Sequence, residues 1–123
     1  MRSRLKSDQI DQIIRRLQSN EPISTRVFQQ FLEECYRIVS HLYRRVRLDT
    51  IVYDPALREE IIEDVTINAL IKALRQYNPS KAGFFTFYYS KSRSLMGVKQ
   101  GFYYRRQRLI NTKKYVDRVM FEE

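Results

Sequence analysis

The stretch DPALREEIIEDVTINALIKALRQYN, residues 54–78, decides the fold class of this chain. Asp54 can cap a helix, and Pro55 then stands at the first helical position, where its missing N–H breaks no hydrogen bond. Glutamates follow in the first turns, where the helix dipole favours negative charge. The apolar residues beyond them recur at helical spacing, at Ile62, Val65, Ala69, Leu70 and Ala73. The pattern predicts one long helix with a buried stripe that ends at Gln76 and Tyr77.

Two more helices are predicted before this one. Residues 7–18 have one apolar helical face that Ser7 or Asp8 can cap, and this face is formed by Ile10, Ile13, Ile14 and Leu17. Residues 19–22, Ser-Asn-Glu-Pro, then break the helix. The next helix begins near Ser24 or Thr25. Its apolar face runs over about five turns, through Val27, Phe28, Phe31, Leu32, Cys35, Ile38, Val39, Leu42, Tyr43 and Val46.

A different pattern follows the turn at residues 78–83, Asn-Pro-Ser-Lys-Ala-Gly. It opens with a dense aromatic cluster made of Phe84, Phe85, Phe87, Tyr88 and Tyr89. We predict a helix from about Thr86 to Gln100. Gly101 is a position where we expect the helix to be weak, here called the soft point. A second cluster of aromatic and basic residues follows it at residues 102–108.

The composition supports a helical protein. With only 3 Gly and 3 Pro, the chain lacks the turn residues that sandwiches and barrels need. The sequence therefore predicts an all-α fold, a compact bundle of about four to five helices. We divide it into an N-terminal helix at residues 1–20, a helical domain at 21–110 and a helical tail at 111–123.

The positive charge of the chain is concentrated near one end. The net charge is +9 over 123 residues. Up to Ser80 there are 13 basic and 11 acidic residues, whereas Lys81 to Arg118 hold 10 basic residues and one acidic residue, Asp117. Such an asymmetry is typical of segments that bind polyanions. We expect the C-terminal third to bind a polyanion and the nearly neutral remainder to form the helical body.

Catalysis has little support in the sequence. Cys35 is the single cysteine and His41 the single histidine, so a Cys/His metal site or a Ser-His-Asp triad lacks members. We interpret His41 as a surface or boundary residue, and we expect no enzyme activity, no cofactor and no metal site. A lone cysteine, the lack of a long apolar run and the lack of a secretory signal predict a cytoplasmic protein.

The interleaved aromatic and basic residues indicate a nucleic-acid partner. Lys and Arg neutralise phosphates, and unpaired bases stack on aromatic rings. Because a duplex does not offer its base faces, this mixture favours single-stranded or melted nucleic acid. We assign Phe85 and one neighbouring phenylalanine to the core, and we assign to stacking the residues Tyr88, Tyr89, Tyr103 and Tyr104.

Four segments occur in an order that matches a known family. CYRIVSHLYRR at residues 35–45 is followed by EDVTINALIKAL at 63–74, then by YNPSK at 77–81 and FTFY at 85–88. Over about residues 28–108 this order resembles the second domain of bacterial RNA polymerase sigma factors. In that family an acidic-leucine helix ends in Leu-Leu-Lys-Ala, a Phe-Asp-x-x-Lys-Gly turn follows, and Phe-Ser-Thr-Tyr-Ala opens the promoter-reading helix.

The resemblance implies a sigma-like initiation factor, which binds core RNA polymerase and recognises and melts the minus-ten promoter element as single-stranded non-template DNA. The helix matching residues 61–74 would dock on the clamp coiled coil of the largest catalytic subunit, through Glu60, Glu63, Asp64, Ile67, Asn68, Ile71 and Lys72. Tyr88 occupies the position of a family tyrosine that stacks on a flipped adenine. The predicted DNA-binding residues are Lys81, Phe87, Tyr88, Tyr89, Lys91, Arg93, Lys99, Tyr103, Tyr104, Arg105, Arg106 and Arg108.

The chain also departs from that family. Lys91 and Ser92 stand where the family usually carries two adjacent tryptophans, and the few residues after Arg118 leave no room for the domain that reads the minus-thirty-five element. In both respects the chain resembles the late-transcription sigma factors of tailed phages, which end in a hydrophobic-acidic peptide that binds the DNA sliding clamp. The corresponding residues here are Val119, Met120 and Phe121, with a frayed helix end as the alternative. A sliding clamp, or a second protein that recognises upstream DNA, is then expected as a further partner. We expect no interaction with a membrane.

Two other functions remain open from the sequence. The chain is alternatively a stand-alone basic helical DNA-binding regulator, either a repressor or a single-strand binder. It is otherwise a polymerase-binding mimic of sigma that does not open promoters. Transcription from a defined start site, with polymerase and this protein together, distinguishes these functions from promoter recognition.

Overall fold

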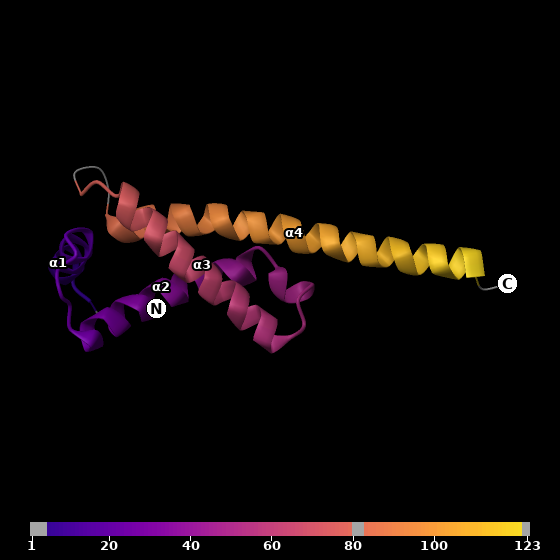
Figure 1. Ribbon diagram of the computed structural model, residues 1–123, viewed down its shortest axis with the longest axis horizontal. Coiled ribbons are helices and arrows are strands. Elements are labelled where there is room, and N and C mark those ends of the chain that lie inside the picture. The colour runs from indigo at the N-terminus through magenta and orange to yellow at the C-terminus, as the bar shows by residue number, and fades with distance from the viewer. Residues whose placement is uncertain (1–4, 80–82, 122–123) are drawn as a thin grey trace.

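The computed structural model describes residues 5–79 and 83–121, and these residues form helices without any strand. In chain order they are α1 (Ser7–Gln18), α2 (Thr25–Arg45), the 3₁₀ turn η1 (Leu48–Thr50), α3 (Pro55–Gln76) and α4 (Phe84–Phe121). Figure 1 shows α2 and α3 packed with the first part of α4, while the rest of α4 extends away from the body. The predicted all-α fold is confirmed.

Local capping explains where α3 and α1 begin. The carboxylate of Asp54 accepts a hydrogen bond from the Ala56 N–H at 3.0 Å, and Pro55 is the first residue of α3, both as predicted. The cap of α1 differs from the prediction. Ser7 is already helical and Lys6 stands at the N-cap, where its backbone N–H donates to the Gln9 side-chain oxygen at 2.9 Å.

The core lies where α2, α3 and the first half of α4 meet. Its largest fully buried side chains are Tyr43, Tyr88, Phe31, Ile14, Leu42, Leu48, Ile61, Ile62 and Met96. Phe84 links the three helices, because its ring lies 5.6 Å from that of Phe31 on α2 and 5.3 Å edge-on from that of Tyr77 at the end of α3. Burial of each such side chain contributes about 1.5–3 kcal/mol.

Helix α1 packs on the C-terminal end of α3. Ile13 and Ile14 of α1 are buried in the core. The Gln18 side-chain amide donates to the Leu74 carbonyl at 3.1 Å and to the Tyr77 carbonyl at 3.3 Å. The N-terminal helix is therefore an integral part of the packed body.

Helix α4 is longer than the sequence predicted. It begins at Phe84 and runs through Gly101 to Phe121, so the predicted soft point and the separate tail beginning at residue 111 do not interrupt it. A helical glycine costs about 1 kcal/mol relative to alanine, which the good helix formers on either side can offset. Only the first half is supported by packing, because every side chain from Arg108 to Met120 is exposed.

Candidate functional site

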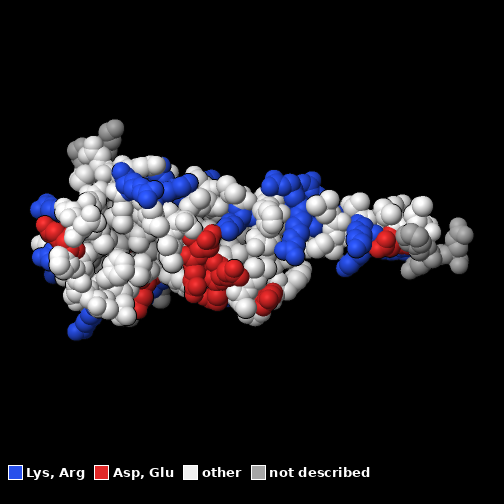
Figure 2. Space-filling view, viewed as in Figure 1, with Lys and Arg blue, Asp and Glu red and all other residues white. Residues whose placement is uncertain are grey.

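One exposed face of α3 carries all the residues predicted to bind polymerase. Glu60, Glu63, Asp64, Ile67, Asn68, Ile71 and Lys72 are exposed and follow one another along a single helical stripe, here called the α3 face. Figure 2 shows a group of acidic side chains over α3, beside the basic side chains that follow α4. The structure therefore brings this predicted set together on one surface.

Apolar surface lies within and beside the α3 face. Ile67 and Ile71 are 54% and 42% exposed, which is unusual for isoleucine in the middle of a well-packed helix. Next to them, a hollow of about 280 Å³ between α2 and α3 is lined by Leu32, Glu33, Tyr36, Glu63, Thr66 and Ile67. An apolar hollow with acidic residues at its rim suits a protein segment that presents apolar and basic side chains.

Tyr88 does not belong to the surface, and its predicted role in base stacking is wrong in this structure. The side chain is 0% exposed, and its hydroxyl donates to the Thr66 carbonyl of α3 at 2.9 Å. Burial raises the pKa of Tyr88 above its usual value and raises the pKa of the neighbouring Cys35 thiol to about 12. A ring enclosed by three helices has no free face for a base, so Tyr88 is a core residue.

The residues on either side of Tyr88 occupy the surface. Phe87 and Tyr89 are half-buried on different edges of α4. The Phe87 ring centroid lies 5.8 Å from that of Tyr77, and the Lys91 ammonium lies 5.1 Å from the Phe87 centroid, a cation–π geometry. Phe87 therefore combines a partly open ring with an adjacent positive charge, the combination expected of Tyr88.

Further along α4 a second group of rings is accessible. Tyr103 and Tyr104 are half-buried, and Phe102, which the sequence reasoning left out of the binding set, is 50% exposed. The rings of Phe102 and Tyr103 meet edge to face at 5.0 Å. Their spacing along α4 is compatible with contact to a nucleic-acid strand that follows this helix.

The predicted basic residues differ in whether they form ion pairs within the protein. Arg93, Arg105, Arg106 and Arg108 are exposed, and neither of the ion pairs found in residues 5–79 and 83–121 involves them. Lys99, in contrast, pairs with Asp64 of the α3 face at 2.9 Å. Lys81 lies outside the described residues.

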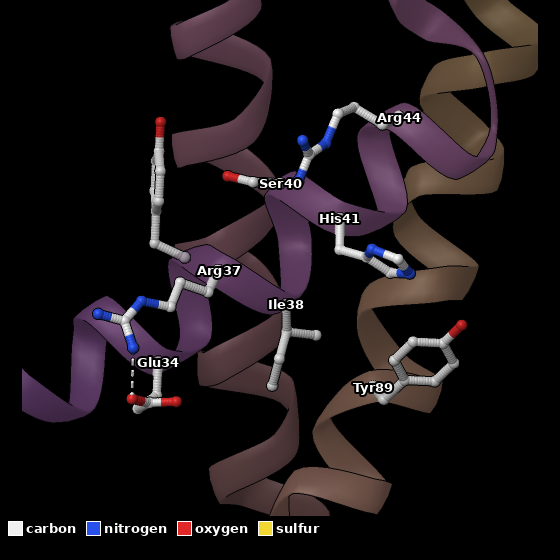
Figure 3. Close-up of a pocket in the computed structure, with 8 residues that line it drawn as sticks. Glu34, Arg37, Ile38, Ser40, His41, Arg44 and Tyr89 are labelled. Atoms are coloured by element: carbon white, nitrogen blue, oxygen red, sulfur yellow. Dashed lines mark hydrogen bonds and ion pairs between the residues drawn. The ribbon is translucent and has the colours of Figure 1, made fainter. Parts of the chain in front are cut away.

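A pocket between α2 and α4 was not predicted from the sequence. It has a volume of about 390 Å³ and is lined by Glu34, Tyr36, Arg37, Ile38, Ser40, His41, Arg44 and Tyr89. Figure 3 shows His41 from α2 and Tyr89 from α4 turned toward the same hollow. The spacing of Arg37, His41 and Arg44 on one face of α2 is the sequence signal that could have indicated it.

The far end of α4 presents the predicted tail residues. Val119 and Met120 are 54% and 65% exposed and remain helical, as does the backbone of Phe121. This end of the helix is therefore ordered as a continuation of α4. Figure 1 shows this end of α4 extending away from the packed body.

The described residues contain no group of three or more His, Cys, Asp or Glu side chains that could hold a metal ion. None of the helices in the described ranges combines the length and the apolar character needed to cross a membrane. Comparisons of the chain with protein-family models, with curated proteins and with solved structures found no significant match.

Proposed function

We propose that this chain is a sigma-like transcription initiation factor, which acts in the cytoplasm of a bacterial or phage-infected bacterial cell. One observation carries the proposal: one packed helical body presents an acidic and apolar face on α3 and, adjoining it, a basic and aromatic surface on α4. Two surfaces of opposite chemistry fit a protein that connects a polymerase to DNA.

The α3 face would bind the clamp coiled coil of the largest catalytic subunit of RNA polymerase. Exposed apolar side chains supply most of the energy of such an interface, while surrounding charges determine the partner and its orientation. Ile67 and Ile71 are the apolar centre of this face, and Glu60 and Glu63 provide charge beside them. The apolar hollow next to Ile67 extends the same surface toward α2.

Helix α4 would hold the non-template strand of the melted minus-ten element. Its exposed arginines can neutralise phosphates, and rings at Phe87, Tyr89 and Tyr104 can stack on unpaired bases. The base-stacking role moves to these rings because Tyr88 is enclosed in the core. The absence of tryptophan from the chain leaves phenylalanine and tyrosine to separate the strands.

In vitro transcription with core polymerase, on genomic DNA with mapped start sites, tests this function. We expect initiation at defined sites that depends on the protein. Ile67→Asp should abolish capture of core polymerase, whereas the matched control Ile110→Asp, on the projecting part of α4, should retain it. No complex with core polymerase at low salt, or initiation that is independent of the protein, would refute the proposal.

A second function, a stand-alone single-strand binder, is favoured by the projecting half of α4. Between Arg105 and Arg118 this half carries six basic residues and one acidic residue. It extends from the body without support from another described element, so it is accessible from all sides. Single-strand affinity that is unchanged by polymerase, together with a failure to initiate transcription, would favour this function.

A further inference from the structure

We propose that the pocket between α2 and α4 is a binding site for one unpaired nucleotide of a DNA strand, with the base against Tyr89 and His41 and the phosphate on Arg44. This inference rests on the proposed function, because it assigns a specific site to single-stranded DNA. It concerns residues of α2 that belong to neither of the surfaces described above.

The size of the pocket and its rings suit a nucleobase. Its volume of about 390 Å³ is within the range of about 300–1,000 Å³ that small-molecule sites occupy. Tyr89 is held at the edge of the core, so its ring is positioned before a ligand arrives, and the exposed imidazole of His41 projects from α2 on the same side (Figure 3). Ile38 adds apolar surface to the lining. Flat aromatic walls of this kind stack on any base.

The charges that line the pocket suit an anion. Glu34 is the single acidic residue of the lining, and its carboxylate is bound by the Arg37 guanidinium at 2.9 Å. The second guanidinium, that of Arg44, is exposed and has no ion pair in the described part of the chain. The lining therefore keeps one guanidinium without an ion pair, which can meet a phosphate.

The pocket is continuous with the basic surface of α4. Arg93 follows Tyr89 by one helical turn, so it lies on the same side of α4. A strand whose base enters the pocket would therefore meet the exposed Arg93 guanidinium with its next phosphate. A free nucleotide lacks this second contact, so the site favours a strand over a monomer.

Binding of a labelled single-stranded DNA oligonucleotide to the full chain, followed by fluorescence anisotropy at low salt, tests the site. Tyr89→Ala should weaken binding about fivefold to about a hundredfold, the loss expected for one stacked base. Tyr89→Phe should bind as the wild type does because it keeps the ring. The matched control is Tyr53→Ala, which removes a tyrosine that is 82% exposed and outside this pocket.

Arginine variants separate the phosphate contact from general attraction. Arg44→Ala should lower the slope of log affinity against log salt by about 0.7, the value for one phosphate contact on a single strand. The control Arg26→Ala, an exposed arginine near the start of α2 and outside the pocket, should leave the slope unchanged. Competition by free deoxynucleoside monophosphate tests whether the monomer alone fills the site.

Photocrosslinking with an oligonucleotide that carries 5-iodouracil gives a readout that does not depend on folding of a variant. We expect crosslinks at Tyr89 or His41. Crosslinks only at other rings, no binding of the oligonucleotide, or full binding by Tyr89→Ala would each overturn the inference. The two proposals can fail separately. Crosslinks at the pocket in a protein that does not support transcription would confirm the nucleotide site and refute the role as an initiation factor.

Discussion

Replacement of Tyr88 by phenylalanine separates a core role from a DNA-binding role at this position. The variant keeps the ring, which is 0% exposed, and removes the hydroxyl that donates to the Thr66 carbonyl at 2.9 Å. Loss of one neutral hydrogen bond inside a protein costs about 0.5–1.5 kcal/mol. We therefore expect Tyr88→Phe to be slightly less stable than the wild type and to bind single-stranded DNA equally well.

Tyr88→Ala cannot distinguish loss of a DNA contact from loss of folding. Truncation of a fully buried aromatic ring costs about 3–5 kcal/mol, while the whole free energy of unfolding of a small domain is about 5–15 kcal/mol. Tyr88→Ala is thus expected to lose DNA binding because a large part of the population unfolds. Phe87→Ala, which removes a partly exposed ring, should instead weaken binding with a smaller loss of stability.

Urea unfolding followed by far-ultraviolet circular dichroism measures the free energy of unfolding, and oligonucleotide anisotropy measures the affinity. A Tyr88→Phe protein with wild-type stability and lost affinity would refute the reasoning. In that case the hydroxyl would contact DNA, and α4 would have to adopt another position when DNA is bound.

Three further predictions concern stability. Gly97→Ala should raise the free energy of unfolding by about 1 kcal/mol, because a Cβ there meets no atom within 4 Å. A lower free energy of unfolding, measured with urea, would contradict the open surface at this position. Ser92→Ala should be neutral or stabilising by up to about 1 kcal/mol, since the buried Ser92 hydroxyl has no hydrogen-bond partner among the described residues; a clear loss of stability would mean that the hydroxyl is bonded. Stability should also fall with rising pH. Burial raises the pKa of the Cys35 thiol from 9.0 to about 12, so the folded state favours the neutral thiol, and the contribution is complete below pH 9.0 and lost as pH rises toward about 12. Cys35→Ala should flatten the pH dependence of the urea midpoint in that window, and an unchanged profile would contradict the assignment.

The sequence predicted α3 well because its start is determined locally. A capping aspartate and a proline at the first helical position act locally, and the apolar stripe behind them selects a single exposed face. The residues of the α3 face were predicted from the resemblance, and the pattern of buried residues explains why they share the exposed side of α3. The cap of α1 was missed because a lysine at the N-cap carries no such signal.

The buried face of α4 could not be predicted in the same way. Five of the six residues from Phe84 to Tyr89 are aromatic, so hydropathy does not indicate which of them turn inward. Tertiary packing selects Phe84, Tyr88, Ser92 and Met96, including a serine, while Val98 remains 69% exposed. The pocket was missed for a related reason, since its residues come from two helices whose register only the packed structure defines.

The Asp64–Lys99 ion pair limits how strongly the two surfaces can influence each other. It joins the α3 face to a predicted DNA-binding residue of α4, and its side chains are 46% and 34% exposed. Solvent screens such a pair, so its contribution is about 0–1 kcal/mol. If a polymerase segment engaged Asp64, the released Lys99 could then change DNA affinity by no more than about fivefold through this contact. Substitutions on the α3 face and on α4 should therefore act almost independently, which makes polymerase capture and strand binding separable measurements on the same protein.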